Sequence, residues 1–416
     1  MKSKIQQFLI TKTDFLSMKD KLSEDELRVF VAKTLDDLCT ENKIALGDIE
    51  RGAIVREIVG ALVSLGPLRP LVEDPTISEI MVNGPHKIYI QRKGRIELTN
   101  VKFDDAKHLI HVIQKMLAAA GSNRRVDESS PYVDFSLKDG SRVNVILPPC
   151  SLIGPVLTIR KFSSDINSID DLLKLKMLNE KMATFLVAGI KAKLNIVVCG
   201  ATGTGKTTIV NVLSRYIPKE ERIITIEDTS ELRLLQEHVV SLQSKQANIE
   251  GKGVISIRDL FINSLRMRPD RIIIGEVRGE EALDMIQSIS SGHTGSLAII
   301  HAASPEDCFN RMVTMLLLSG IRLSTEEIKN QVAHAIDLIV HIELFLDGCR
   351  RVTHITDFSY DLKDDKLMME NIFEFKQEKI TAEGNVIGTW VMSKKKPSFY
   401  DSLIKRNAEL PAGFFD

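Results

Sequence analysis

Eight consecutive residues in the middle of the chain, Gly200 to Thr207, have the types and spacing of a phosphate-binding loop. They satisfy the pattern G-x-x-x-x-G-K-[ST] at every position. Glycines let backbone N–H groups turn toward phosphate oxygens without a Cβ atom in the way, and the positive end of a following helix attracts the same anion. We therefore expect Lys206 to bridge the terminal phosphates of ATP and the Thr207 hydroxyl to ligate Mg²⁺. The residues expected to contact the nucleotide are Gly200, Ala201, Thr202, Gly203, Thr204, Gly205, Lys206, Thr207 and Thr208.

The segments on both sides of this loop supply the context that it needs. Residues 194–199 are an apolar run that predicts a strand entering the loop, and residues 207–213 predict a helix leaving it. Phosphate-binding loops occur in this order of strand, loop and helix. The alternative, a glycine-rich turn with an incidental lysine, does not explain the flanking elements.

Two groups of acids follow apolar runs of the same kind. Glu227, Asp228 and Glu231 come after RIITI, and Glu276 comes after RIII. Hydrolysis needs an acid that holds the metal and a group that orients water, and the carboxyl ends of neighbouring strands lie where ligands bind. We expect the catalytic acids to be Glu276, Glu231 and Glu227. We expect the metal ligands to be Thr207, Asp228 and Glu276. The alternative is that these acids only end strands at a solvated rim.

Two histidines flank a further apolar run. His293 lies in GHTG before SLAII, and His301 follows that run. A neutral imidazole both donates and accepts hydrogen bonds, so these side chains could sense the γ-phosphate or a neighbouring subunit. A lone histidine is more often structural, and the sequence leaves both interpretations open.

The elements that carry these groups are expected to form a sheet of parallel strands. Continuous apolar runs alternate here with helical segments, which is typical of parallel strands buried on both faces and predicts an α/β fold. The runs are residues 195–200, 222–227, 271–277 and 296–302.

A different pattern precedes this region. From Gly66 onward, short runs alternate apolar and polar residues, which predicts antiparallel strands in a smaller α+β domain. The expected strands are residues 77–84, 87–91, 95–99, 132–137, 141–147 and 156–162. One helix is expected to interrupt them, with an apolar stripe made of Leu109, Val112, Ile113, Met116 and Leu117.

The first part of the chain has helical periodicity. Residues 21–38 predict a helix that starts with a capping box of Ser23 and Glu26 and has an apolar stripe. The stripe is Leu27, Phe30, Val31, Leu35 and Leu38. A second helix is expected to place Ile54, Val55, Ile58, Val59 and Leu62 on one face. The expected domains are a helical segment at 1–65, an α+β domain at 66–163 and an α/β domain at 164–416, with a linker at 163–168.

Composition excludes several classes of protein. Lys and Arg total 55 against 56 for Asp and Glu, so no global positive field indicates a nucleic-acid partner. No apolar run approaches the ~20 residues that cross a bilayer, and the N-terminus lacks the pattern of a signal peptide, so we expect a cytoplasmic protein. Five cysteines lie far apart without a C-x-x-C pair, which indicates reduced thiols and no structural zinc.

Four motifs now stand in order, at residues 200–208, 224–232, 266–282 and 292–302. In this order they resemble the Walker A loop, Asp box, Walker B segment and His box of the type II/type IV secretion and pilus-assembly ATPase superfamily. The resemblance extends over nearly the whole chain, with further similar segments at residues 66–85, 124–149, 154–162 and 248–253.

Within this superfamily the chain is most similar to the Tad/Flp pilus assembly ATPases. The supporting features are the N-terminal helical segment, DESSPYVD and the C-terminal KPSFYDSLIKRNAELPAGFF. The resemblance implies a RecA-like P-loop motor domain and a homohexamer that binds ATP between the two domains of each subunit. It also implies a place at the cytoplasmic face of the inner membrane, peripheral contact with the membrane machinery, and a pilus platform protein as partner. No direct contact with nucleic acid is expected.

The resemblance also implies roles for single residues. Glu276 would be the Walker B acid, and Glu231 or Glu227 would position water. His293 and His301 would belong to the His box. In the N-terminal domain, the phosphates would be reached by Arg142 and Arg160. A guanidinium can neutralise charge on the γ-phosphoryl oxygens, although a strand arginine is more often a surface ion-pair partner.

One departure from the family pattern concerns the His box. Related proteins usually carry hydroxyl residues in this strand and Asn shortly after the histidine, whereas this chain has Ala298, Ile299 and Ala303. A hydrogen-bond relay through those side chains is therefore not expected. The remaining alternatives are a conjugation-type secretion ATPase, a RecA-like nucleic-acid motor with a basic, aromatic groove, and a nucleotide-binding switch that does not hydrolyse.

Overall fold

The computed structural model describes residues 24–41, 65–92, 95–121, 125–137, 139–161, 166–245, 252–361, 366–408 and 410–416, and positions 47, 48, 50–52, 54, 55 and 59. The chain divides into two compact units, Met1–Phe162 and Ser163–Asp416. The N-terminal helical segment therefore falls in the same unit as the strands that follow it. Within the described ranges, no helix has the length and apolarity that a membrane span requires.

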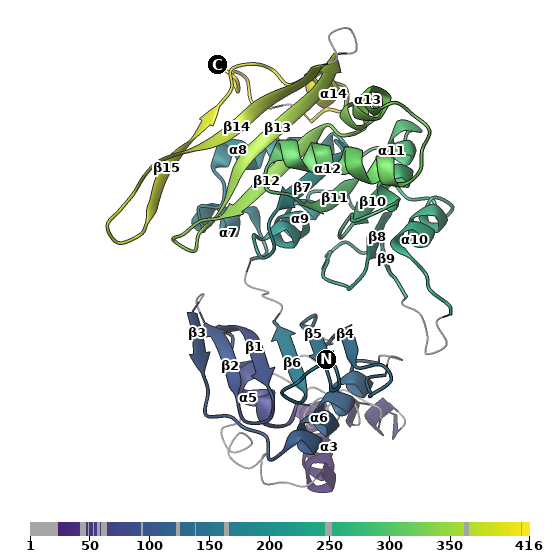
Figure 1. Ribbon diagram of the computed structural model, residues 1–416, viewed down its shortest axis with the longest axis vertical. Helices are drawn as coiled ribbons and strands as arrows, with labels where there is room; N and C mark the ends of the chain where they lie inside the picture. Colours follow the sequence, from purple (N-terminus) through teal and green to yellow (C-terminus); the bar gives the residue numbers. More distant parts are fainter. Residues whose placement is uncertain are drawn as a thin grey trace. The chain divides into compact units, whose positions relative to one another are not determined.

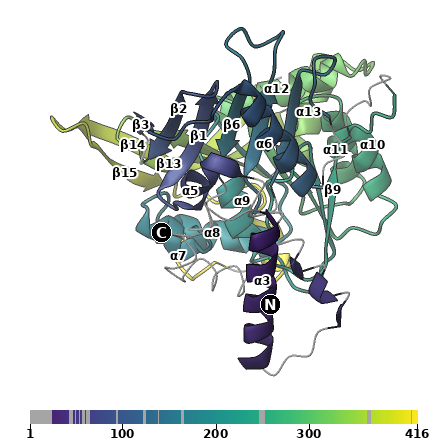
Figure 2. The same ribbon diagram turned by 90° about the horizontal axis from the view of Figure 1, so that it is seen from below.

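The first unit contains a six-stranded sheet in the order β3-β2-β1-β6-β5-β4. Its paired strands are all antiparallel, as the alternating pattern predicts. The strands are β1 Ile77–Asn83, β2 Ile88–Arg92, β3 Arg95–Leu98, β4 Tyr132–Ser136, β5 Arg142–Ile146 and β6 Val156–Arg160. Helix α6, Ala106–Ala119, lies beside the strands of this sheet (Figure 2). All five residues of its predicted apolar stripe are buried and pack with the apolar residues of the strands.

Short helices lead into this sheet. Helix α3 covers Glu24–Glu41 and buries Val31 and Leu35, two members of the predicted stripe. The predicted cap residue Ser23 lies outside the described residues, as do Ile58 and Leu62 of the second predicted helix. The described positions of that second helix are helical at 54, 55 and 59. The remaining elements are the 3₁₀ helix η2 at Gly66–Leu68 and α5 at Arg69–Glu73.

The second unit is built on a nine-stranded sheet in the order β15-β14-β13-β12-β7-β11-β10-β8-β9 (Figure 1). The six strands from β12 to β9 in this order are parallel, which confirms the predicted α/β fold. Their bounds are β7 Ile196–Gly200, β8 Ile223–Glu227, β9 Val239–Gln243, β10 Arg271–Ile274, β11 Leu297–His301 and β12 Leu338–Leu344.

Helices cover both faces of this parallel sheet. Alternate residues of β7 enter opposite cores: Ile196 and Val198 pack with α7 to α9, and Val197 and Cys199 pack with α10 to α13. Figure 1 shows these two sets of helices on opposite sides of the strands. This double burial explains the continuous apolar runs. The helices are α7 Ile169–Lys174, α8 Glu180–Lys191, α9 Lys206–Ser214, α10 Ile257–Ser264, α11 Glu281–Ser290, α12 Pro305–Leu318 and α13 Thr325–Ala335.

Three antiparallel strands extend the sheet beyond β12, and the sequence analysis did not predict them. They are β13 Arg350–Asp361, β14 Lys366–Ile380 and β15 Val386–Met392. The chain then forms α14, Tyr400–Lys405, and its end returns to α8, where Phe185 contacts the rings of Phe373, Phe414 and Phe415. The C-terminal segment thus closes the core on the α8 face.

We predict that Phe185→Ala destabilises the second unit by about 3–5 kcal/mol, because it leaves a cavity where several rings meet. Trp390 on β15 is the single tryptophan in the sequence, so its fluorescence during urea unfolding reports on this unit. Leu235→Ala is the matched control, because Leu235 is 67% exposed and should change stability by less than about 0.5 kcal/mol. Equal midpoints for the two variants would contradict this role of Phe185.

Candidate functional site

The loop between β7 and α9 makes a tight turn at the carboxyl edge of the parallel sheet. Gly203 and Gly205 have φ angles of 77° and 97°, in the left-handed region that favours glycine. A Cβ atom on Gly200 would lie 2.3 Å from the Ile342 carbonyl oxygen of β12, so only glycine fits there. The turn ends at the start of α9, whose positive end attracts anions.

The first residue of α9, Lys206, extends back over the loop. Its Nζ donates to the carbonyl oxygens of Gly200 at 3.1 Å and Ala201 at 2.7 Å. The same Nζ lies 3.4 Å from Nδ1 of His301, at the end of β11. Lys206 is only 6% exposed, so its charge acts in a site from which most water is excluded. A buried cation at a helix N-terminus is suited to bind polyphosphate.

Glu276 and His301 continue from this lysine as a connected row. Nε2 of His301 lies 3.2 Å from Oε1 of Glu276, and Nη2 of Arg278 donates to Oε2 of Glu276 at 2.5 Å. A proton on Nε2 lets the ring donate to Glu276 and accept from Lys206 at Nδ1. The order along the row is therefore Lys206, His301, Glu276 and Arg278.

The charges in this row adjust the pKa of its members. Burial alone would raise the pKa of Glu276, but the hydrogen bond and charge of Arg278, with the charges of His301 and Lys206, outweigh burial and lower it. Burial first, and the charge of Lys206 second, lower the pKa of His301. Near pH 7 the row therefore contains an ionised carboxylate and a neutral imidazole.

Glu227, which ends β8, and Glu231, which follows that strand, have different environments. The Thr207 hydroxyl donates to Oε2 of Glu231 at 3.2 Å, so Glu231 lies beside the start of α9. Glu227 is 3% exposed, and its Oε1 accepts from the backbone N–H groups of Glu231 at 2.8 Å and Leu232 at 2.9 Å. Glu227 thus holds the loop that presents Glu231, so of these two acids Glu231 is the one available to a bound metal ion and its water.

Comparison with known proteins shows the family of this chain. A family model described as "Type II/IV secretion system protein" matches residues 61–386. The chain belongs to this family.

The chain is similar to a putative conjugal transfer protein of Mycobacterium tuberculosis. The two are 31% identical over 316 residues, which cover 74% of this chain and 89% of that protein. The type IV secretion system protein VirB11 of Brucella suis is 32% identical over 338 residues, or 74% of this chain and 92% of that protein. The crystal structure of the Brucella suis VirB11 ATPase with sulphate is 31% identical and covers 73% of this chain and 96% of that chain, with a TM-score of 0.38. The family assignment rests on the sequence matches.

Two further predicted site residues are His293 and Asp228, and His293 lies away from the row. His293 precedes β11, at the amino edge of the sheet, whereas His301 ends that strand at the carboxyl edge. Nδ1 of His293 is buried and has no hydrogen-bond partner among the described residues. Asp228 accepts a hydrogen bond from the Ser244 hydroxyl. Their predicted roles toward γ-phosphate and metal stay predictions.

The two predicted arginines belong to the first unit. Arg142 on β5 and Arg160 on β6 are direct partners across antiparallel strands, so their side chains leave the same face of the sheet. Nε of Arg160 lies 3.5 Å from Oε1 of Glu79 on β1. Their predicted contact with phosphate stays a prediction.

Sequence reasoning missed two arginines of the second unit. Nε of Arg350, at the start of β13, donates to the Gly203 carbonyl oxygen at 2.8 Å. No local pattern could have found this contact, because 147 residues separate the two partners. Arg278, in contrast, lies two residues after Glu276 within the motif at residues 266–282, and its opposite charge was the available signal.

The residues around Thr207 fit a magnesium ion that is held mainly by substrate. Among the described residues, no cluster of three or more His, Cys, Asp and Glu side chains has the arrangement of a metal site. Mg²⁺ usually keeps several waters and binds through one or two carboxylates together with phosphate oxygens, so such a cluster is not required. The Thr207 hydroxyl and the neighbouring Glu231 carboxylate are suitable donors. When bound, Mg²⁺ neutralises charge that develops on the phosphates.

The buried Glu227 predicts a pH-dependent stability. Burial raises its pKa from 4.5 to about 7, so the folded state holds more protons than the unfolded state between these values. The contribution of Glu227 to the free energy of unfolding is therefore fully present below pH 4.5 and is lost as the pH rises through about 7. The full loss is roughly 3 kcal/mol.

We predict that wild type loses stability relative to Glu227→Gln between about pH 5 and about pH 8, because glutamine still accepts the two N–H bonds but does not ionise. Urea unfolding followed by Trp390 fluorescence measures the difference at each pH. A difference that stays constant over this range would contradict the raised pKa of Glu227.

Proposed function

We propose that this chain is an ATPase motor that drives assembly or retraction of a Tad/Flp type IV pilus. The observation that carries the hydrolytic part is the row of Lys206, His301 and Glu276 beside the glycine-rich loop. A glycine-rich loop can bind a nucleotide without this row. Hydrolysis also needs a group that orients water, and the ionised Glu276 in the row supplies one.

Each residue of the row has a distinct task in this proposal. Lys206 neutralises charge on the β- and γ-phosphate oxygens, and the N-terminus of α9 adds to that effect. Thr207 and Glu231 hold the metal and its water ligands. Glu276, kept ionised by Arg278, accepts a hydrogen bond from the attacking water, and His301 fixes the orientation of Glu276. The products are ADP and inorganic phosphate.

We further propose that the chain works as a homohexamer and that Arg142 and Arg160 bind phosphate oxygens. The two side chains leave the same face of the sheet from directly opposite positions, so both can reach one anion. Two features support a motor in which domain motion follows ATP binding and product release. They are the sequence motifs that resemble those of the secretion ATPases and the division of the chain into two compact units.

The proposed place of work is the cytoplasmic face of the inner membrane, with a platform protein of the pilus as partner. Contact with the membrane machinery would be peripheral, and no nucleic acid is involved. The support for this placement is the family, described as type II/IV secretion system proteins, and the type IV secretion system protein VirB11 among the relatives.

A second candidate is an ATPase of a conjugation-type, type IV secretion system. The relatives favour it directly, because a putative conjugal transfer protein and VirB11 are 31% and 32% identical to this chain. Both candidates use the same hydrolytic site and differ in what the motor moves.

Turnover by the purified chain tests the shared part of the two candidates. We predict that Lys206→Ala lowers ATP hydrolysis by at least about a hundredfold, because it removes a preorganised charge from the transition state. Lys219→Ala, an exposed lysine after α9, is the charge-matched control and should hydrolyse ATP like wild type. Wild-type turnover by Lys206→Ala would end the assignment of this loop.

The host cell separates the two candidates. A deletion strain that expresses Lys206→Ala should lack surface fibres in electron micrographs, and wild-type chain should restore them. Normal fibres together with lost transfer of a secreted substrate would instead establish the secretion role.

A further inference from the structure

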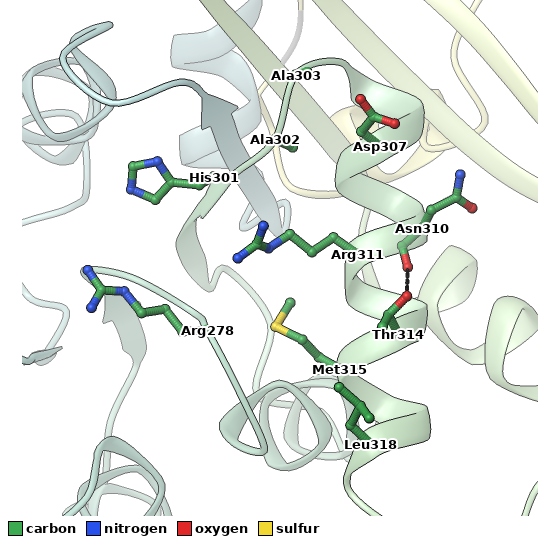
Figure 3. A pocket seen from close by; sticks show the side chains of 10 residues that line it. All are labelled: Arg278, His301, Ala302, Ala303, Asp307, Asn310, Arg311, Thr314, Met315 and Leu318. Atoms are coloured by element: carbon green, nitrogen blue, oxygen red, sulfur yellow. Dashed lines mark hydrogen bonds between the residues drawn. The ribbon is translucent and has the colours of Figure 1, made fainter.

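A cavity of about 490 Å³ opens beside the catalytic row, within the second unit. Three elements line it: the loop after β10 with Arg278, the end of β11 with His301, and α12 with Asp307, Arg311 and Thr314. Figure 3 shows the guanidinium of Arg311 extending from α12 toward His301 and Arg278, away from Asp307. Two guanidinium groups from separate elements therefore approach the same space.

Arg311 forms no ion pair with the acid one turn earlier on its own helix. Asp307 lies one turn earlier on α12, at the spacing where helical ion pairs form, yet no ion pair joins the two. Within the part of the chain that the structure describes, Arg311 makes no side-chain hydrogen bond either. Arg278 gives one nitrogen to Glu276, and its side chain is still 56% exposed. Both guanidinium groups have donors available to an anion in the cavity.

The cavity adjoins the place where phosphate would be cleaved. His301 lines the cavity and also lies 3.4 Å from Nζ of Lys206 and 3.2 Å from Glu276. Ala302 and Ala303, which follow it, contribute only methyl groups to the lining. An anion that leaves Lys206 therefore meets His301 first and the two arginines next.

We propose that this cavity binds inorganic phosphate, the hydrolysis product, through Arg311 and Arg278 before the phosphate leaves the protein. This inference rests on the proposed function. At neutral pH phosphate is a compact anion with one to two negative charges, and its oxygens match the paired N–H donors of a guanidinium. A site of this kind delays phosphate release and so lets bulk phosphate inhibit turnover.

Inhibition of ATP hydrolysis by added inorganic phosphate tests the site. Arg311→Gln should raise the phosphate inhibition constant by about tenfold, the effect of losing one charge-assisted hydrogen bond, and should leave KM for ATP within about twofold of wild type. Arg322→Gln removes the same charge from an exposed position beyond α12 and should leave the inhibition unchanged. A phosphate inhibition constant equal to wild type in Arg311→Gln would overturn the proposal.

A second pair of variants does not depend on arginine. Thr314→Asp places a negative charge in the cavity from the exposed side of α12, and Thr314→Asn is its neutral match. The aspartate should weaken phosphate inhibition and the asparagine should not. Equal inhibition in both variants counts against a phosphate site here.

A direct binding measurement distinguishes failure of the phosphate site from failure of the proposed ATPase function. Titration of the full chain with inorganic phosphate, followed by ³¹P line broadening, should show binding that Arg311→Gln weakens, whether or not ATP is hydrolysed. If wild type binds phosphate in this way but does not hydrolyse ATP, the ATPase assignment is wrong and the phosphate site is still supported. Loss of hexamer in Arg311→Gln at unchanged phosphate affinity would assign the cavity to a subunit contact and refute the proposal.

Discussion

The structure of the site depends on how closely the glycine-rich loop packs on the strand beside it. Gly200 ends β7 in the middle of the sheet, and the Ile342 carbonyl of β12 occupies the space that a side chain would need. Because β7 is buried on both faces, this loop cannot shift without disturbing two cores. The position of Lys206, and of every group that contacts it, follows from this packing.

A row made of a cation, a neutral imidazole and an anion then connects three strand ends. Lys206 follows β7, His301 ends β11 and Glu276 follows β10, so the parallel order of the sheet brings them together. The neutral imidazole between a cation and an anion lets each keep its charge without direct contact. Glu227 takes no part in this row, because its carboxylate is used to shape the next loop.

The sequence predicted the parallel sheet and the loop because both leave local signals: continuous apolar runs and a fixed spacing of glycine, lysine and threonine. It also placed Glu276 and His301 at strand ends. The sequence could not distinguish the role of Glu227 from that of Glu231. The two residues differ in burial and in hydrogen-bond partners, and the spacing of residues in the sequence does not show either property. The strands after β12 were missed although each pairs with the strand that follows it in the chain. The contact of Arg350 with Gly203 was missed because 147 residues separate the two partners.

A structure of the chain with Mg²⁺ and a non-hydrolysable ATP analogue tests the central claim most directly. The account predicts that the terminal phosphates lie against the loop at the start of α9, that Lys206 contacts their oxygens, and that Thr207 contacts the metal. An analogue bound elsewhere, with Lys206 still donating to the carbonyls of Gly200 and Ala201 and not to phosphate, would contradict it.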